Sequence, residues 1–380
     1  MVSSPLIGGH RSLLILPVLL TRNEQNPMKR ILTLSVIVVM TAVSAATASA
    51  QAATPLTPVT LFLGYIPNIQ FAPVYVALNR GYFKDAGLDV TLEHSYNETD
   101  GLTRIGVNHL QFGMISGEQI ILARAQGAPV TYFFRWYQKF PVGIASPVDA
   151  HITDPKQLVG HVVSVPAKYG ASYIGFQALL HAVGLQESDL KEVREIGFNT
   201  APLLCARQID ASVVYIANEP LQVEQQCFKT NVIAISDYAN LVSNGLVTNE
   251  TTLQNHPDWV RGISNAFARG LADTIADPSA AYTISKQYIP DLGDDPVQMQ
   301  VLRNSIPLWQ STTNPPGYSD PAAWALTQDT LLAMKLIAQP VDLSKVFTND
   351  YVPAPLPGIP SATTAATMPA TLMATMTVTP

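Results

Sequence analysis

Residues 75–90 read YVALNRGYFKDAGLDV, and this stretch shows how the chain is built. It continues an apolar helical segment predicted for 72–78, closes it with Gly81, and leads into a strand predicted for 89–94. Further along the chain, runs rich in Val, Ile and Phe alternate with helical patterns in the same way. This alternation is typical of βαβ units, so we expect an α/β protein with largely parallel sheets.

Two sets of strands and helices follow one another, and a helical region completes the pattern. The first set has predicted strands at 59–66, 89–94, 112–116 and 129–136 and helices at 72–78, 102–107 and 118–126. The second has strands at 161–165, 193–198, 211–216 and 232–236 and helices at 171–183, 202–208 and 220–227. Helices are then expected at 257–276, 278–288, 296–309 and 321–337. Asp-Pro pairs at 154–155, 277–278, 295–296 and 320–321 combine an N-cap acceptor with a proline suited to the first helical position.

Composition limits the class of protein. The chain has 380 residues, of which 47% are apolar and 13% charged, and this is enough for two domains with real cores. A formal net charge of −6 argues against binding to nucleic acid or to anionic membranes. The two cysteines, Cys205 and Cys227, are too few for a cysteine-built metal cluster. A disulfide between them remains open, although two separate buried thiols are favoured.

The motifs of common enzyme classes are absent from the sequence. It contains no Gly-x-Ser-x-Gly elbow, no His-Glu-x-x-His pair and no Gly-x-Gly-x-x-Gly turn that opens a helix, and its seven histidines are scattered. We therefore expect no catalytic residues, no metal and no cofactor.

The N-terminal region indicates export. Met28 and two basic residues precede an uncharged segment, 31–50, whose apolar part is too short to span a bilayer. The segment ends in Ala-Ser-Ala, so we expect a signal region at 1–50, with cleavage after Ala50 and a start codon that could be Met28. The protein then lies free outside the cytoplasmic membrane, or an uncleaved segment tethers it there. The uncharged tail 353–380, rich in Pro, Thr, Ala and Met, is expected to be disordered.

Polar side chains collect after the strands of the first set. Because ligands bind beyond the carboxyl ends of parallel strands, we expect the site to lie in a cleft between two lobes. The candidates after the first three strands are Tyr65, Asn68, Gln70, Phe71, Asp100, Ser116, Gly117 and Glu118. Two of these groups also have purely structural interpretations, since Asn68 can cap a helix and Ser116-Gly117-Glu118-Gln119 has the pattern of a capping box.

An aromatic run and two polar loops add further candidates. Six aromatic residues lie within 132–140, and because this run outlasts a strand we expect Trp136 and Tyr137 to emerge at the loop and to stack on a flat ligand. In the second set the candidates are Lys168, Tyr169, Ser172, Asn218 and Glu219. A glutamate at a helix start such as Glu219 also has a simpler interpretation, because the helix dipole favours it there.

The sequence resembles the substrate-binding proteins of ABC importers, in the group that binds thiamine-pyrimidine precursors, alkanesulfonates and riboflavin. The resemblance covers about residues 57–350 and is strongest in GYIPN at 64–68 and in the stretch 75–90. It implies the type II periplasmic-binding-protein fold, with lobe 1 at 57–145 plus 238–350, lobe 2 at 146–237 and crossover segments near 143–150 and 237–242. It also implies a monomer that captures a small molecule and docks on a membrane permease.

Within that group, the resemblance and the residues favour a planar nitrogen heterocycle. The segments 116–119 and 218–220 are most similar to riboflavin-uptake binding proteins, while Asn68 and Glu219 also match the thiamine-pyrimidine binders. The candidate loops carry four carboxylates, at Glu98, Asp100, Glu118 and Glu219, against Lys168 and Arg135. Riboflavin is therefore the first choice and a thiamine-pyrimidine precursor the second.

Three alternatives remain open at this point. The first is an anion binder of the sulfonate or nitrate type, and the second is a sensor or adhesion module. The third is an enzyme similar to the thiamine-pyrimidine synthases, which resemblance associates with a cysteine-rich run that this sequence lacks.

Overall fold

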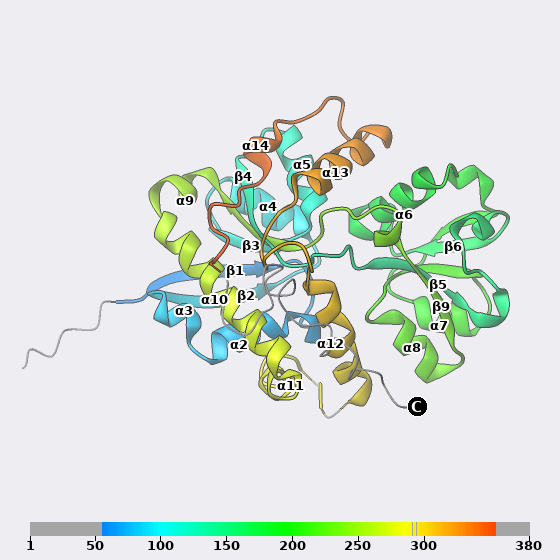
Figure 1. Cartoon of the computed structure of the whole chain (residues 1–380), viewed down its shortest axis with the longest axis horizontal. Coiled ribbons are helices and arrows are strands. Elements are labelled where there is room, and N and C mark those ends of the chain that lie inside the picture. Colours follow the sequence, from blue (N-terminus) through cyan, green and yellow to red (C-terminus); the bar gives the residue numbers. More distant parts are fainter. Residues whose placement is uncertain (1–54, 291, 294, 355–380) are drawn as a thin grey trace, which may run out of the picture. The chain divides into compact units, whose positions relative to one another are not determined.

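The computed structural model describes residues 55–290, 292–293 and 295–354 (Figure 1). The predicted signal region and the tail beyond Ala354 lie outside the described residues. Among the helices of the described part, none combines the length and the apolar character that a bilayer crossing requires.

Two five-stranded sheets form the framework. The order in the first sheet is β2 (Leu88–His94), β1 (Thr57–Leu63), β3 (Phe112–Ile115), β10 (Gly245–Asn249) and β4 (Val130–Arg135). The order in the second is β7 (Glu192–Glu195), β6 (Val162–Val165), β8 (Ala211–Tyr215), β5 (Val142–Pro147) and β9 (Thr230–Ala234). β10 and β5, which the sequence pattern missed, each run antiparallel to both of their neighbours. The expected parallel sheets are therefore confirmed except for one inserted strand in each.

The chain passes between the sheets twice, and one passage differs from the prediction. It leaves the first sheet after Arg135 and enters the second at Val142, so the crossover predicted at 143–150 is wrong. Residues 142–145, assigned to lobe 1 from the sequence, pair with β8 of the second sheet. β5 contains a glycine and ends in a proline, so its strand character comes from its two neighbours rather than from its sequence. The return passage lies between β9 and β10 and includes the predicted segment 237–242.

Helices cover both faces of the first sheet, and the alternation of side chains in β1 shows how. Val59, Leu61 and Leu63 point to the face that packs against α2 (Ala72–Asn79), α10 (Pro257–Ala276), α11 (Pro278–Ser285) and α12 (Pro296–Trp309). Phe62 points to the opposite face, among side chains of α4 (Glu98–Gly106), α5 (Gly117–Ala125) and α13 (Pro321–Ala333). Three short helices, α3 (Tyr82–Asp85), α9 (Glu250–Asn255) and α14 (Leu343–Val346), complete this part.

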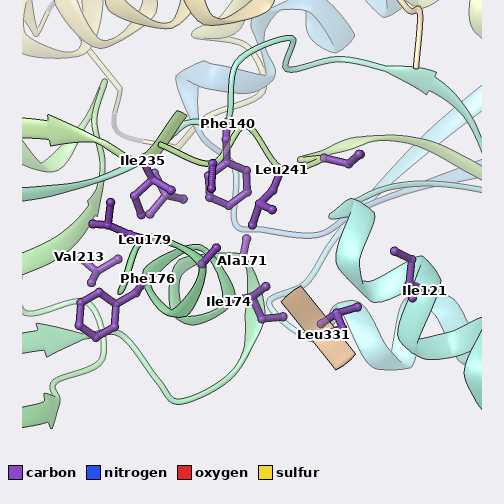
Figure 2. Close-up of a cluster of buried hydrophobic side chains, with 14 of the residues drawn as sticks. Ile121, Phe140, Ala171, Ile174, Phe176, Leu179, Val213, Ile235, Leu241 and Leu331 are labelled. Carbon is purple, nitrogen blue, oxygen red and sulfur yellow. The ribbon is translucent and has the colours of Figure 1, made fainter. Parts of the chain in front are cut away.

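One apolar cluster continues from this second face into the second sheet (Figure 2). Phe140 and Leu241 come from the two passages of the chain and lie among Ile174 and Leu179 of α6 (Gly170–Ala182). Leu331 of α13 belongs to the same cluster. The two sheets are thus joined by packed side chains as well as by the backbone.

The four Asp-Pro pairs start helices as predicted. Each aspartate accepts a hydrogen bond from a backbone N–H in the first turn that follows: Asp154 before the 3-10 helix Pro155–Leu158, Asp277 before α11, Asp295 before α12 and Asp320 before α13. Proline at the first helical position costs nothing there, because its missing N–H has no partner within the helix.

The prediction of two separate thiols is wrong. Cys205 ends α7 (Thr200–Cys205) and Cys227 follows α8 (Glu219–Gln226), and the two form a disulfide with their Cα atoms 5.7 Å apart. The helices pack against each other. This proximity is a tertiary effect that a sequence separation of 22 does not reveal.

Candidate functional site

A cavity of about 640 Å³ lies among the loops that follow the strands of both sheets. The loops after β1, β2, β3 and β4 supply lining residues from the first sheet, and those after β6, β7 and β8 supply them from the second. This is the position expected from the topology, because the carboxyl ends of parallel strands meet at one edge of a sheet.

The cavity brings together most of the residues predicted from the sequence. The predicted residues that line it are Tyr65, Asn68, Gln70, Phe71, Ser116, Trp136, Tyr137, Tyr169, Ser172, Asn218 and Glu219. Asp100, Gly117, Glu118 and Lys168 do not line it.

Asp100 and Lys168 point to other partners. The exposed carboxylate of Asp100 lies 3.4 Å from Arg104 of the same helix. The ammonium group of Lys168 lies 3.1 Å from the carboxylate of Glu187. Each charge is therefore directed to an ion pair at the surface rather than to the cavity.

Gly117 and Glu118 lie behind the cavity wall. A Cβ atom on Gly117 would come within 2.4 Å of Val242, so the glycine allows close packing of α5 rather than approach of a ligand. Glu118 is 1% exposed, and neither carboxyl oxygen has a hydrogen-bond partner among the described residues.

The loop after β1 is fixed by its amides. The side-chain oxygen of Asn68 accepts a hydrogen bond from the backbone N–H of Gln70 at 2.9 Å, which confirms the capping interpretation. The amide nitrogen of Gln70 donates to the phenol oxygen of Tyr137 at 3.2 Å and thereby connects this loop to the loop after β4. Both residues also line the cavity, so the structural role does not exclude contact with a ligand.

The prediction that Trp136 and Tyr137 emerge from the fold at a loop is wrong. Each is 2% exposed, although each also contributes to the cavity wall. The ring centroid of Trp136 lies 5.7 Å from that of Phe71 and 5.6 Å from that of Trp309. The two residues are therefore part of the core and part of the site at once.

Glu98 is the main functional candidate that the set of predicted site residues missed. Its Oε1 atom accepts hydrogen bonds from the backbone N–H and the hydroxyl of Ser116, at 3.1 and 3.0 Å, and a long one from Asn244 at 3.5 Å. Ser116 thus binds Glu98 instead of capping α5, and the predicted capping box is wrong. Gly64 makes room for this carboxylate, since a Cβ atom there would lie 2.5 Å from Oε1.

Glu219 lines the cavity from the side of the second sheet. Its Oε2 atom accepts a hydrogen bond from the backbone N–H of Tyr215 at 2.9 Å, so its interaction with the helix dipole is not its only structural role. Burial raises the pKa of both Glu98 and Glu219 to about 7. The pKa of the Tyr215 phenol is raised by burial first and then by the charges of Glu98 and, more weakly, Glu219. Tyr215 therefore lies within reach of both carboxylates.

Three aromatic rings form what we call the rim of the cavity: Tyr65, Tyr96 and Phe198. The ring centroid of Tyr65 lies 5.3 Å from that of Tyr96 and 5.7 Å from that of Phe198, while the latter two rings stack at 5.6 Å. Tyr96 is 56% exposed and Phe198 63%, although both line the cavity. Tyr96 and Phe198 were not predicted as site residues. Each follows a strand, and an aromatic residue in that position could have been chosen as a candidate from the sequence.

The charge of the cavity has one sign. Its only ionisable lining side chains besides tyrosines are Glu98 and Glu219, and no Lys, Arg or His of the described residues lines it. In the same part of the chain, no group of three or more His, Cys, Asp and Glu side chains is arranged to hold a metal ion. The site is suited to a ligand that donates hydrogen bonds and presents flat apolar surface.

The family model described as NMT1/THI5 like matches residues 68–281, more than half of the chain. The chain belongs to this family. Among the relatives of this NMT1/THI5-like protein is the riboflavin-binding protein RibY of Chloroflexus aurantiacus, 36% identical over 303 residues, which cover 78% of this chain and 86% of RibY. Another is the 4-amino-5-hydroxymethyl-2-methylpyrimidine phosphate synthase of Legionella pneumophila, 25% identical over 300 residues, with coverages of 78% and 92%.

Solved structures agree with this assignment at the level of the fold. The periplasmic aliphatic sulphonate binding protein SsuA of Escherichia coli superposes on the NMT1/THI5-like chain with a TM-score of 0.63 at 15% identity. The match covers 79% of this chain and 94% of SsuA. The chain has the type II periplasmic-binding-protein fold, as its resemblance to ABC importer binding proteins implied.

Proposed function

We propose that this protein is the extracytoplasmic solute-binding component of an ABC importer and that it captures a planar nitrogen heterocycle, with riboflavin the first choice. The observation that carries the proposal is the cavity itself, which combines two carboxylates and several aromatic rings with no cationic side chain among its described lining residues. Carboxylates accept hydrogen bonds from ring N–H and hydroxyl groups. Aromatic rings stack on a flat ligand and contribute roughly 0.5–1.5 kcal/mol each beyond burial of area.

Size and similarity favour riboflavin over a pyrimidine precursor, which is the second choice. A cavity of about 640 Å³ has room for a fused three-ring system with its sugar-alcohol chain, whereas a single pyrimidine ring would leave much of it unfilled. The relative named as a riboflavin-binding protein is also more similar, at 36% identity against 25% for the pyrimidine phosphate synthase.

The anion binder and the enzyme are less well supported. A sulfonate or nitrate would face Glu98 and Glu219 without an opposing positive charge. The synthase relative keeps a synthase-like enzyme as the second candidate function. Both cysteines of this chain are joined in a disulfide, which leaves no thiol for a cysteine-rich site.

The cellular context completes the proposal. We infer that the region 1–50 exports the protein, that the two sheets define two lobes that close on the ligand, and that the closed monomer docks on a membrane permease. Closure follows when the ligand binds the closed arrangement more tightly than the open one.

The test is to purify the exported protein and to record the absorbance and mass spectra of any small molecule released on denaturation. Riboflavin, 4-amino-5-hydroxymethyl-2-methylpyrimidine and an alkanesulfonate are then titrated separately by calorimetry. We expect saturable 1:1 binding of riboflavin and much weaker binding of the other two. Preferential binding of the sulfonate would overturn the heterocycle assignment, and turnover or a covalent adduct with pyridoxal phosphate would favour the enzyme.

A further inference from the structure

Glu98 lines the cavity and Glu118 lies behind the cavity wall, and of the two only Glu98 accepts hydrogen bonds from described residues. We propose that Glu98 carries the negative charge that receives an N–H group of the ligand, and that Glu118, buried behind it, stays uncharged. The role of Glu98 toward the ligand rests on the proposed function. The protonation state of Glu118 does not depend on which ligand is bound.

The contacts of Glu98 prepare one of its oxygen atoms for a ligand. All three hydrogen bonds to its carboxylate end at Oε1, from the backbone and hydroxyl of Ser116 and from the amide of Asn244. Its side chain lines the cavity. Three donors on one oxygen stabilise the ionised form and fix the orientation of the group, so Oε2 remains available to accept a bond from the ligand.

The surroundings of Glu118 have the opposite effect. It lies in the first turn of α5, is 1% exposed, and neither of its oxygens has a hydrogen-bond partner within the part of the chain that the structure describes. An isolated buried carboxylate is costly, so the group keeps its proton. Burial first and then the charge of Glu98 raise the pKa of Glu118, and the weaker effects of its backbone and of Gln119 do not offset them. Because the hydrogen bonds from Ser116 and Asn244 go to Glu98, we expect Glu98 to ionise first.

The other titratable groups around the pair do not reverse this order. The phenol of Tyr132 donates to the carbonyl of Ser243 at 3.0 Å, and burial raises its pKa. The guanidinium of Arg135 is directed to backbone carbonyls, those of Tyr137, Gln138 and Leu241. Tyr215 and Glu219 line the cavity from the second sheet, and the pKa of the Tyr215 phenol is raised by burial and then by the charge of Glu98.

The experiment has two parts, of which the first uses the ligand-free protein. Melting temperatures are measured from pH 6 to pH 9 for the wild type, Glu118→Gln, Glu98→Gln and the charge-matched control Asp89→Asn, which changes an exposed carboxylate. A carboxyl whose pKa is raised on folding stabilises the protein at low pH, and this stability is lost as the pH rises through the folded pKa. We expect the wild type and Asp89→Asn to lose melting temperature toward pH 9, and Glu118→Gln to lose clearly less.

The second part titrates the same proteins with riboflavin at pH 6, 7 and 8. Because the competent form contains ionised Glu98, and Glu219 has a similarly raised pKa of about 7, wild-type affinity should fall at least about tenfold from pH 8 to pH 6. Glu118→Gln copies the uncharged acid and should stay within about twofold of the wild type at pH 7. Glu98→Gln should bind at least about tenfold more weakly at pH 8.

Each part can overturn the proposal. Equal melting profiles for Glu118→Gln and the wild type would show that Glu118 holds no extra proton. Wild-type affinity of Glu98→Gln at pH 8 would remove Glu98 from ligand recognition. If the wild type does not bind riboflavin at all, the proposed ligand and the role of Glu98 toward it both fail, while the melting profiles still decide the state of Glu118.

Discussion

Glu98 and Asp100 lie two residues apart, and the direction of each side chain decides whether its carboxylate lines the cavity or faces the surface. Both carboxylates follow the second strand, and Asp100 was chosen from the sequence as a site residue, whereas only Glu98 lines the cavity. Residues two apart on a helix point to different sides, so one of them turns inward and the other reaches Arg104 at the surface. The sequence pattern placed the start of this helix at residue 102 instead of 98, and the facing of the two carboxylates could not be predicted without the correct start.

Glu219 allows a direct test at this scale. Glu219→Gln keeps the shape of the side chain and removes the charge, and a charge-assisted hydrogen bond contributes about 1.5–3 kcal/mol. Riboflavin affinity at pH 8 should therefore fall roughly 10- to 150-fold while the protein remains folded. Calorimetry on the variant and on Asp89→Asn gives the answer, and equal affinities would leave Glu219 with only its bond to Tyr215.

Trp136 combines a buried ring with a place in the cavity wall, so its truncation should affect both stability and affinity. Trp136→Ala should lower the free energy of unfolding by about 3–5 kcal/mol, because it removes a large ring from a packed core. The matched control is Trp324→Ala, which truncates a fully buried tryptophan outside the cavity. Urea unfolding should show similar losses for both variants, and riboflavin titration should show weaker binding only for Trp136→Ala. Unchanged binding by Trp136→Ala would assign this ring to the core alone.

At the scale of helices and strands, features that depend on neighbouring residues were predicted well, whereas strands that depend on pairing with distant segments were missed. The Asp-Pro pairs gave correct helix starts because a cap and its proline are adjacent in sequence. β5 and β10 were missed because they are short and pair with strands that lie far away in the chain. For the same reason the first crossover was predicted too late, since the strand that follows it had not been found.

Asp320 at the start of α13 allows the contribution of a helix cap to stability to be measured. Its carboxylate accepts a hydrogen bond from the backbone N–H of Ala322 at 2.9 Å. Asp320→Ala should cost about 0.5–2 kcal/mol of unfolding free energy in urea denaturation. Asp329→Ala removes an exposed carboxylate from the same helix without removing a cap, and should stay within about 0.5 kcal/mol of the wild type. Similar losses in the two variants would mean that net charge, and not capping, explains the effect.

For the whole molecule, the sequence was sufficient to predict two α/β units, a cleft between their loops and a set of candidate site residues, most of which line the cavity. It was not sufficient to predict what depends on distant parts of the chain coming together. The disulfide between α7 and α8 is one example. The rim is another, because Tyr65 and Tyr96 come from the first sheet and Phe198 from the second.

The disulfide makes a prediction about the molecule as a whole. Replacing Cys205 and Cys227 together by alanine should lower the free energy of unfolding by about 2–4 kcal/mol, since the bond restricts the unfolded chain. Both residues lie outside the cavity, so riboflavin affinity should not change. Urea denaturation of the wild type with and without dithiothreitol, beside the double variant, measures the loss. A large fall in affinity would instead indicate that the disulfide helps to shape the binding site.

The rim has a kinetic consequence. Rings from both sheets meet at the rim, and Tyr96 and Phe198 are exposed there, so we expect a ligand that passes the rim to require Tyr65, Tyr96 and Phe198 to move apart. Entry should then be slower than the 10⁵–10⁷ M⁻¹s⁻¹ or so that is typical when no conformational change is needed. Departure should be slowed by the same motion, so a captured molecule would have a long residence time even if its equilibrium affinity is modest.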